Sequence, residues 1–266
     1  MLIIHTALHA EARALIEFFG LKRQHDIRQF ACFAADRVFL IESGIGKTDT
    51  ATAVGWAGAY LQTQQPLWLN VGMAGHVDIE VGCLRLAHRI EDQASGQRFY
   101  PPQLLHPVPA SDNLITVEQP AHEYPPDAMV DMEASAFIRS ASRFSSIELV
   151  QSVKVISDNL QHPPNRMKAA EVEALMSPHM IQIDRIAQQL LELRELLIQE
   201  NRQADLLLER WHFSHYQRNQ LKRLLQRYQA LNRDGSVLDA IPENITNSKH
   251  LIKWLNESLD QTTTQY

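Results

Sequence analysis

Short apolar runs alternate with helical patterns along most of this chain. Leu2–Leu8 is an apolar run, and apolar side chains then recur at helical spacing up to Gly20, which predicts a strand followed by a helix. Further helices are predicted over Thr48–Leu61 and from Val130 onward. Other runs predict strands: Phe30–Ser43, which divides at Ala35–Arg37, then Leu67–Gly72, Val81–Ile90, Leu114–Val117 and Val150–Asn159. Strands separated by helices predict an α/β fold in which a sheet lies between helical layers.

The pattern changes after Met180. Apolar residues then alternate at spacings of three and four, which suits packing on another helix or burial against the chain's own sheet: Ile183, Ile186, Leu190, Leu193 and Leu197. A second amphipathic helix carries Leu221, Leu224, Leu225 and Tyr228. A turn at Asn232–Ser236 and a short helix at Lys249–Leu259 follow. We expect two parts, residues 1–198 and a helical C-terminal extension over 199–266.

Composition narrows the class of protein. The chain has 266 residues, a net charge of −6, 45% hydrophobic and 21% charged residues. These values suit a globular protein, and the negative balance argues against a general nucleic-acid-binding protein. Cys32 and Cys83 lie far apart, which favours buried thiols over a disulfide framework or metal site. Because Met1–Leu15 lacks a basic signal-peptide start and no apolar run has membrane-spanning length, we expect a cytoplasmic protein.

A glycine turn at Ser43–Lys47 suggests a ligand site. A phosphate-binding P-loop needs a glycine where Ile41 stands, and the dinucleotide fingerprint needs one where Asp49 stands, so neither motif fits. A strand end, two glycines and a helix start still leave backbone N–H donors free for a polar ligand. From this stretch alone, a ligand-binding turn and a merely structural connection are equally good interpretations.

Other stretches favour a ligand site. Five short segments occur in order: Ala7–Leu15, Ser43–Ala53, Asn70–Asp78, Val130–Phe137 and Val155–Asn159. Together they resemble the nucleoside phosphorylase superfamily, most closely the 5′-methylthioadenosine/S-adenosylhomocysteine nucleosidases, over roughly Met1–Leu197. The resemblance implies a phosphorylase-like three-layer sandwich with a central mixed sheet, a small nucleoside as ligand, and a homodimer or higher homo-oligomer. It implies no metal and no organic cofactor.

The resemblance also implies roles in N-glycosidic cleavage. Asp158 matches the aspartate that protonates the departing purine, Glu133 the glutamate that holds the ribose hydroxyls, and Glu11 the glutamate that activates water. Met132 matches a residue that packs on the sugar. Structural interpretations compete: a helix cap for Asp158, and solvated helix positions for Glu133 and Glu11. The same motifs place further residues at the substrate: Gly44, Ala74, Gly75 and Val117.

The nucleophile is a separate question. The resembling phosphorylases often carry an arginine where this chain has Asn70, and a phosphate dianion needs fixed positive charge. Arg13 and Lys47 are the nearby basic residues, so we favour water over phosphate. Met73 and the short Val81–Val130 region, where Val117–Pro120 must serve the base side, depart from the family pattern. A phosphorylase and a non-catalytic nucleoside- or partner-binding protein therefore remain alternatives.

The extension carries basic and aromatic residues in the segment Arg210–Arg233. One interpretation is a surface for nucleic acid or an acidic partner. The favoured one is a helical appendage whose aromatics pack on the body while its charges face water. His212 and His215 have no carboxylate or cysteine at metal-ligand spacing, so a metal site is rejected.

Overall fold

The computed structural model describes residues 1–107, 109–120, 124–163, 167–231 and 236–263. It divides into two compact units, Met1–Arg194 and Glu195–Tyr266. Helix α5 (Met180–Arg210) contributes to both, and the boundary expected after residue 198 lies inside this helix.

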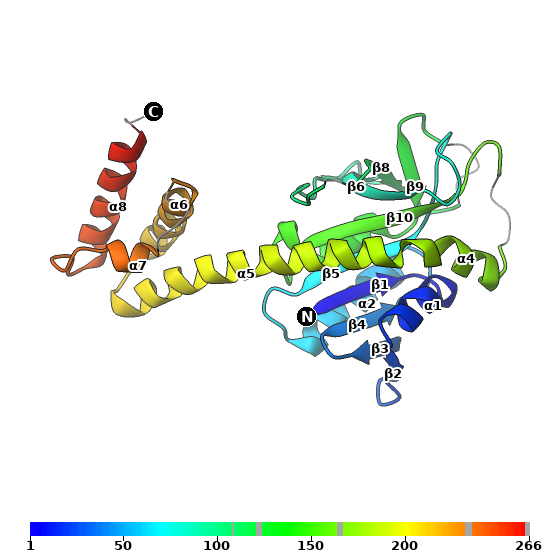
Figure 1. Cartoon of the computed structure of the whole chain (residues 1–266), viewed down its shortest axis with the longest axis horizontal. Helices are drawn as coiled ribbons and strands as arrows, with labels where there is room; N and C mark the ends of the chain where they lie inside the picture. Colours follow the sequence, from blue (N-terminus) through cyan, green and yellow to red (C-terminus); the bar gives the residue numbers. More distant parts are fainter. Residues whose placement is uncertain (108, 121–123, 164–166, 232–235, 264–266) are drawn as a thin grey trace. The chain divides into compact units, whose positions relative to one another are not determined.

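A ten-stranded mixed sheet forms the centre of the first unit (Figure 1). Its path is β10-β6-β8-β9-β5-β1-β4-β3-β2, with β7 paired to β6 and β10 paired also to β5. Strands β5, β10, β6, β8 and β9 therefore close into a ring, while the remaining strands extend from β5. The strands are β1 (Leu2–Thr6), β2 (Lys22–Arg23), β3 (Ala31–Ala35), β4 (Val38–Glu42), β5 (Leu67–Gly75), β6 (Leu84–Asp92), β7 (Arg98–Phe99), β8 (Ser111–Thr116), β9 (Ala128–Asp131) and β10 (Val150–Asp158).

Helices cover this sheet. They are α1 (His9–Phe18), α2 (Lys47–Leu61), α3 (Ala134–Ala141), α4 (Ala169–Met176) and the first part of α5. Helix α1 contacts α4, and α2 contacts α3. Figure 1 shows α1 and α4 near each other at the right of the view. The expected α/β sandwich with a central mixed sheet is confirmed.

Parallel pairing gathers the carboxyl ends of several strands. Strands β1, β5 and β10 run in the same direction, so the residues that follow or end them meet at one edge of the sheet. Strand β9 is antiparallel to β5, with Val130 opposite Gly75, and this register brings Asp131 to the same edge. A run of buried apolar residues supports each strand, among them Ile3, Trp68 and Val153.

The expectation of a helix from Val130 was wrong at its start. Ala128–Asp131 forms strand β9, and α3 begins only at Ala134. Asp131 ends the strand because its carboxylate turns back and accepts a hydrogen bond from the Ala134 N–H (2.8 Å). The apolar pattern of so short a strand is not distinguishable from the first turn of a buried helix.

The second unit has its own core. Helices α6 (His215–Leu231), α7 (Val237–Ala240) and α8 (Ser248–Thr263) pack with the end of α5 around Leu207, Phe213 and Leu255. Phe213 and Trp211 therefore pack within this unit rather than as solvent-facing aromatics, whereas Tyr216 is exposed. Helix α7 was not expected, and Asn232–Gly235 of the expected turn lie outside the described residues.

The structure also tests the expectations for the apolar seam after Met180 and for the two cysteines. Ile183, Ile186 and Leu190 of the α5 seam are buried. Both cysteines are free thiols, but only Cys32 is buried as expected, whereas Cys83 is partly exposed. None of the helices in the described part of the chain combines the length and apolarity needed to cross a bilayer.

Candidate active site

A pocket of about 200 Å³ lies where the carboxyl ends of β1, β5, β9 and β10 meet. Seven of the expected site residues line it: Glu11, Ala74, Gly75, Val117, Met132, Glu133 and Asp158. Gly44 does not line the pocket, although its neighbour Ile45 does. The structure thus brings together residues from all five segments of the family resemblance, while their chemical roles stay predictions.

Glu11 is held by backbone donors on two elements. Its Oε2 accepts hydrogen bonds from the N–H groups of Ala7 (3.0 Å) and Leu8 (2.9 Å), and its Oε1 accepts one from Met73 (3.0 Å). Only 5% of the residue is exposed, so the solvated helix position considered from sequence is wrong. Burial raises the pKa of Glu11, although the charge of Lys154 and these three backbone donors oppose the rise.

Glu133 is the N-cap residue of α3 and joins it to the glycine turn. Its Oε1 accepts from the Gly46 N–H (2.9 Å) and its Oε2 from the Met132 N–H (3.3 Å). The residue is 8% exposed, so the solvated first-turn interpretation is also wrong. Burial, followed by the negative charge of Asp131, raises the pKa of Glu133 to about 7, against the opposing charge of Lys154.

A buried ion pair lies beneath these two glutamates. Lys154 Nζ contacts Asp131 Oδ2 at 2.8 Å, and their side chains are 1% and 0% exposed. Asp131 also accepts from the Thr116 hydroxyl (2.8 Å). Burial alone would lower the pKa of Lys154, but the carboxylates of Asp131, Glu133 and Glu11 raise it. The ammonium group is therefore held charged by the carboxylates around it.

A buried polar chain supports the glycine turn. Asn70 Nδ2 donates to His5 Nδ1 (2.9 Å), and His5 Nε2 lies 2.8 Å from the Ser43 hydroxyl, which donates to the Gly44 carbonyl (2.6 Å). Burial, assisted by the charge of Lys154, lowers the pKa of His5 to about 3, so the imidazole is neutral. Asn70 thus fixes the turn from beneath and is not among the residues that line the pocket.

Asp158 forms the opposite wall of the pocket. Its two carboxylate oxygens accept hydrogen bonds from the hydroxyls of Tyr124 and Ser157. Asp158 ends strand β10, and the next helix begins only at Ala169, so the helix-cap interpretation is wrong. Burial, followed by the hydrogen bond to Asp158, raises the pKa of Tyr124 above its ordinary value.

Two glycines leave room for these carboxylates. A Cβ atom at Gly72 would lie 2.9 Å from Glu11 Oε1, and one at Gly75 would lie 2.5 Å from both Asp158 Oδ2 and Tyr124 Cε1. Strand β5 therefore needs glycine at both positions for the two side chains to reach the pocket.

Several residues that line the pocket or lie beneath it had no role predicted from the sequence. Asp131 and Ser157 line the pocket from two of the five segments, and Tyr124 lines it from the short Val81–Val130 region. Lys154 lies in the strand that ends at Asp158. A lysine inside an otherwise apolar strand was the available signal for the buried ion pair, because lysine is almost never fully buried without a partner.

The two basic residues considered for phosphate binding lie elsewhere. Arg13 pairs with Glu173 (3.1 Å), and Lys47 pairs with Asp92 (2.8 Å) and Glu118. Among the described residues that line the pocket, none is a lysine or arginine. The described residues also contain no group of three or more His, Cys, Asp or Glu side chains arranged to hold a metal ion.

Comparison with solved structures identifies the fold. No family model matches the chain, and no curated protein matches it by sequence. The futalosine hydrolase of Helicobacter pylori strain 26695 aligns with a TM-score of 0.58 at 14% identity, over 71% of this chain and 97% of the hydrolase. The 5′-methylthioadenosine/S-adenosylhomocysteine nucleosidase of Neisseria meningitidis, in complex with methylthio-immucillin-A, aligns with a TM-score of 0.53 at 17% identity, over 68% and 97%.

The Helicobacter pylori nucleosidase in complex with butyl-thio-DADMe-immucillin-A gives a TM-score of 0.55 at 14% identity, over 72% of this chain and 97% of that protein. The chain therefore has the fold of these nucleosidases and of futalosine hydrolase, the fold that the sequence motifs predicted from their resemblance to the nucleoside phosphorylase superfamily.

Proposed function

We propose that this protein hydrolyses the N-glycosidic bond of a purine nucleoside or thionucleoside. The observation that carries the proposal is the charge of the pocket wall. Four carboxylates line it, Glu11, Asp131, Glu133 and Asp158, without a lysine or arginine among the described lining residues. Such a wall suits the positive charge that develops on a sugar during glycosidic cleavage.

The same charge distribution favours water over phosphate as the nucleophile. A phosphate dianion in this pocket would meet carboxylates, and the nearest buried cation, Lys154, is already paired with Asp131. Neutral water has no such cost. Among the described residues, Glu11 accepts hydrogen bonds only from backbone N–H groups, and burial raises its pKa, which makes its carboxylate a stronger base.

Two of the carboxylates, Glu11 and Asp158, lie at different ends of the pocket and can therefore act on different parts of the substrate. Glu11 contacts β5 at Met73 and Asp158 lies against Gly75, two residues further along, which is roughly 7 Å of strand. We assign Glu11 to the attacking water and Asp158 to the departing base. In its acid form Asp158 protonates a ring nitrogen and so relieves the negative charge that builds on the purine.

We assign Glu133 to binding the sugar. One of its oxygens is held by the Gly46 N–H, and the carboxylate lies between the glycine turn and Met132. An ionised carboxylate accepts from two adjacent ribose hydroxyls, which orients the sugar and favours positive charge on it. Met132 supplies an apolar surface beside it.

Purine release from a small panel of nucleosides tests the proposal. The panel contains methylthioadenosine, adenosylhomocysteine, adenosine, inosine, guanosine and futalosine, the last because a protein of the same fold is a futalosine hydrolase. Each substrate is incubated with and without phosphate. We expect release without phosphate. Release only with phosphate would identify a phosphorylase, and silence from folded protein would favour a non-catalytic nucleoside- or partner-binding protein.

Assembly and location are part of the same proposal. We expect a homodimer or higher homo-oligomer that works on a small-molecule nucleoside, as the family resemblance implies, and a cytoplasmic location, as the start of the sequence suggests. Sedimentation of the purified full-length chain tests the oligomeric state independently of catalysis.

A further inference from the structure

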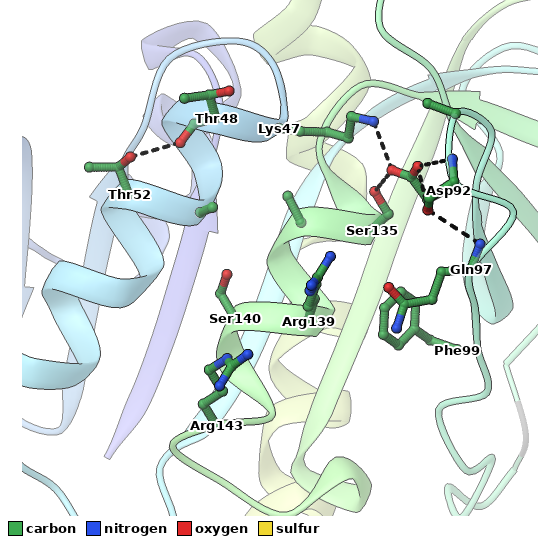
Figure 2. Close-up of a pocket in the computed structure, with 14 residues that line it drawn as sticks. Lys47, Thr48, Thr52, Asp92, Gln97, Phe99, Ser135, Arg139, Ser140 and Arg143 are labelled. Carbon is green, nitrogen blue, oxygen red and sulfur yellow. Dashed lines mark hydrogen bonds and ion pairs between the residues drawn. The ribbon is translucent and has the colours of Figure 1, made fainter.

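A second, larger cavity lies in the first unit, outside the proposed active site. It is a groove of about 630 Å³ between the start of α2, helix α3 and the segment from Asp92 to Phe99 (Figure 2). Apart from its charged residues, its lining includes the polar side chains of Thr48, Thr52, Gln97 and Ser140. The proposed hydrolysis does not use this groove.

Two arginines at the C-terminal end of α3 line the groove, one in the helix and one just after it. Arg139 lies in the last turn of α3, and Arg143 lies in the turn that follows the end of the helix at Ala141. Figure 2 shows both in the groove. In the described part of the chain, neither guanidinium group has a hydrogen bond or an ion pair. Ten N–H donors in two planar forks are thus available in one cavity, about five for each arginine.

The other charged side chains that line the groove, Lys47 and Asp92, pair with each other. Lys47 Nζ lies 2.8 Å from Asp92 Oδ2 and also pairs with Glu118. Asp92 further accepts from the hydroxyls of Ser95 (2.9 Å) and Ser135 (2.9 Å). Burial alone would raise the pKa of Asp92, but these hydrogen bonds, that from Lys47 foremost, lower it, so its charge is fixed and internally paired. Glu118 is not a lining residue, and the charges of Lys47 and Asp92 cancel, so the surplus charge of the lining itself is the positive charge of the two arginines.

We propose that this groove is a binding site for a small phosphate-bearing ligand, held by Arg139 and Arg143. Planar guanidinium forks match the oxygens of phosphate groups and form charge-assisted hydrogen bonds with them. The hydroxyls of Thr48 and Ser140 line the same cavity and supply further polar contacts. Inorganic phosphate, diphosphate and the phosphates of a nucleotide share this chemistry.

The groove adjoins the elements that hold Glu133. Gly46 donates its N–H to Glu133, and the next residue, Lys47, lines the groove. Glu133 caps α3, and Ser135 in the first turn of that helix donates to Asp92. The groove therefore extends from the two arginines to the starts of both helices that position Glu133, where Lys47 and Ser135 line it.

Isothermal titration of the full-length protein with inorganic phosphate and with pyrophosphate tests the site without any enzymatic readout. We expect saturable binding of pyrophosphate, weakened about tenfold or more by Arg139→Gln and by Arg143→Gln, because each loses charge-assisted hydrogen bonds. Arg37→Gln removes an exposed arginine from the turn between β3 and β4 and is the matched control, with unchanged binding expected.

Several outcomes would overturn the site. One is that neither anion binds saturably. Another is that wild type and both groove variants bind with equal affinity. A third is that Arg37→Gln loses as much affinity as the groove variants. Arg139→Lys separates charge from geometry: it retains weaker binding if the guanidinium forks hold the ligand, and full retention would contradict their role. Since titration needs no nucleoside, its result stands whether or not the protein hydrolyses one.

Discussion

Individual pocket residues depend on glycines that carry no chemistry themselves. Gly75 is the clearest case, because the space that a Cβ would take is occupied by Asp158 and Tyr124. Sequence motifs pointed to Gly75 and Asp158 separately. The requirement that links them follows only from the register of β5 with β10, which places the two residues opposite each other.

Gly75→Ala tests this link. The added methyl group would lie 2.5 Å from Asp158 Oδ2, so we expect it to displace the carboxylate and lower the rate of base release about a hundredfold. Gly55→Ala in helix α2 is the control, since its Cβ meets open space and alanine favours a helix by up to about 1 kcal/mol. Equal rates in the two variants would contradict the role of Gly75.

Tyr124 is predicted to position Asp158. Tyr124→Phe keeps the ring but removes the hydroxyl that donates to the carboxylate. Because a hydrogen bond to a charged group contributes roughly 1.5–3 kcal/mol, we expect kcat to fall about tenfold or more with KM little changed. Tyr60→Phe, at an exposed tyrosine of α2, serves as the control. A variant with wild-type kcat would show that the hydroxyl does not act on the reaction.

Glu133 gives the pocket a pH dependence of stability. Its pKa rises from an ordinary 4.5 to about 7 in the folded protein, so the folded state binds more protons than the unfolded state between these values. Stability must therefore fall as pH rises through that window. The free energy of unfolding, measured with urea, should decrease from pH 5 to pH 8. This decrease should be about 3 kcal/mol smaller in Glu133→Gln than in wild type. An equal decrease in the free energy of unfolding for wild type and variant would contradict the raised pKa of Glu133.

At the scale of elements, the buried pair Lys154–Asp131 joins two strands that do not pair with each other. Strand β10 pairs with β5 and β6, whereas β9 pairs with β5 and β8. The ion pair closes the ring of strands from inside and at the same time places one positive charge beneath Glu11 and Glu133. Its function is thus both structural and electrostatic.

A double-mutant cycle measures that link. Lys154→Met leaves Asp131 buried without its partner, and we expect it to lower the free energy of unfolding by about 3–5 kcal/mol. Asp131→Asn alone should also destabilise, and the double variant should recover part of the loss. Strictly additive single effects, measured by urea unfolding, would contradict a direct coupling of β9 to β10.

Elements were predicted from sequence to different extents. Strands β1, β4, β5 and β10 and helix α2 could be read from apolar runs bounded by glycine and polar residues, because they are buried and long enough for the pattern to show. Strand β9 could not, since Val130–Asp131 continues without a break into the apolar face of α3. The closing of the ring by β10 with β6 is a long-range pairing that no local pattern encodes.

At the scale of the whole molecule, the chain combines two cores. The first unit holds every residue that lines the proposed active site and the arginine groove, and the second unit is built on its own apolar cluster. The site was predictable to the extent that motif residues follow strand ends. The roles of Tyr124 and Lys154 were not predictable. Asp158, the partner of Tyr124, is 34 residues away in the sequence, and Asp131, the partner of Lys154, lies on a different strand.

The most direct test of the central claim is purine release in phosphate-free buffer, on the best substrate of the panel, by wild type, Glu11→Gln and Asp158→Asn. A carboxylate pocket that activates water predicts release by wild type and a loss of about a hundredfold or more in each variant. Glutamine at position 11 must also turn an NH₂ group toward a backbone N–H, so folding of the variants is checked by circular dichroism. Release that needs phosphate, or that persists in the folded variants, would contradict hydrolysis by these residues.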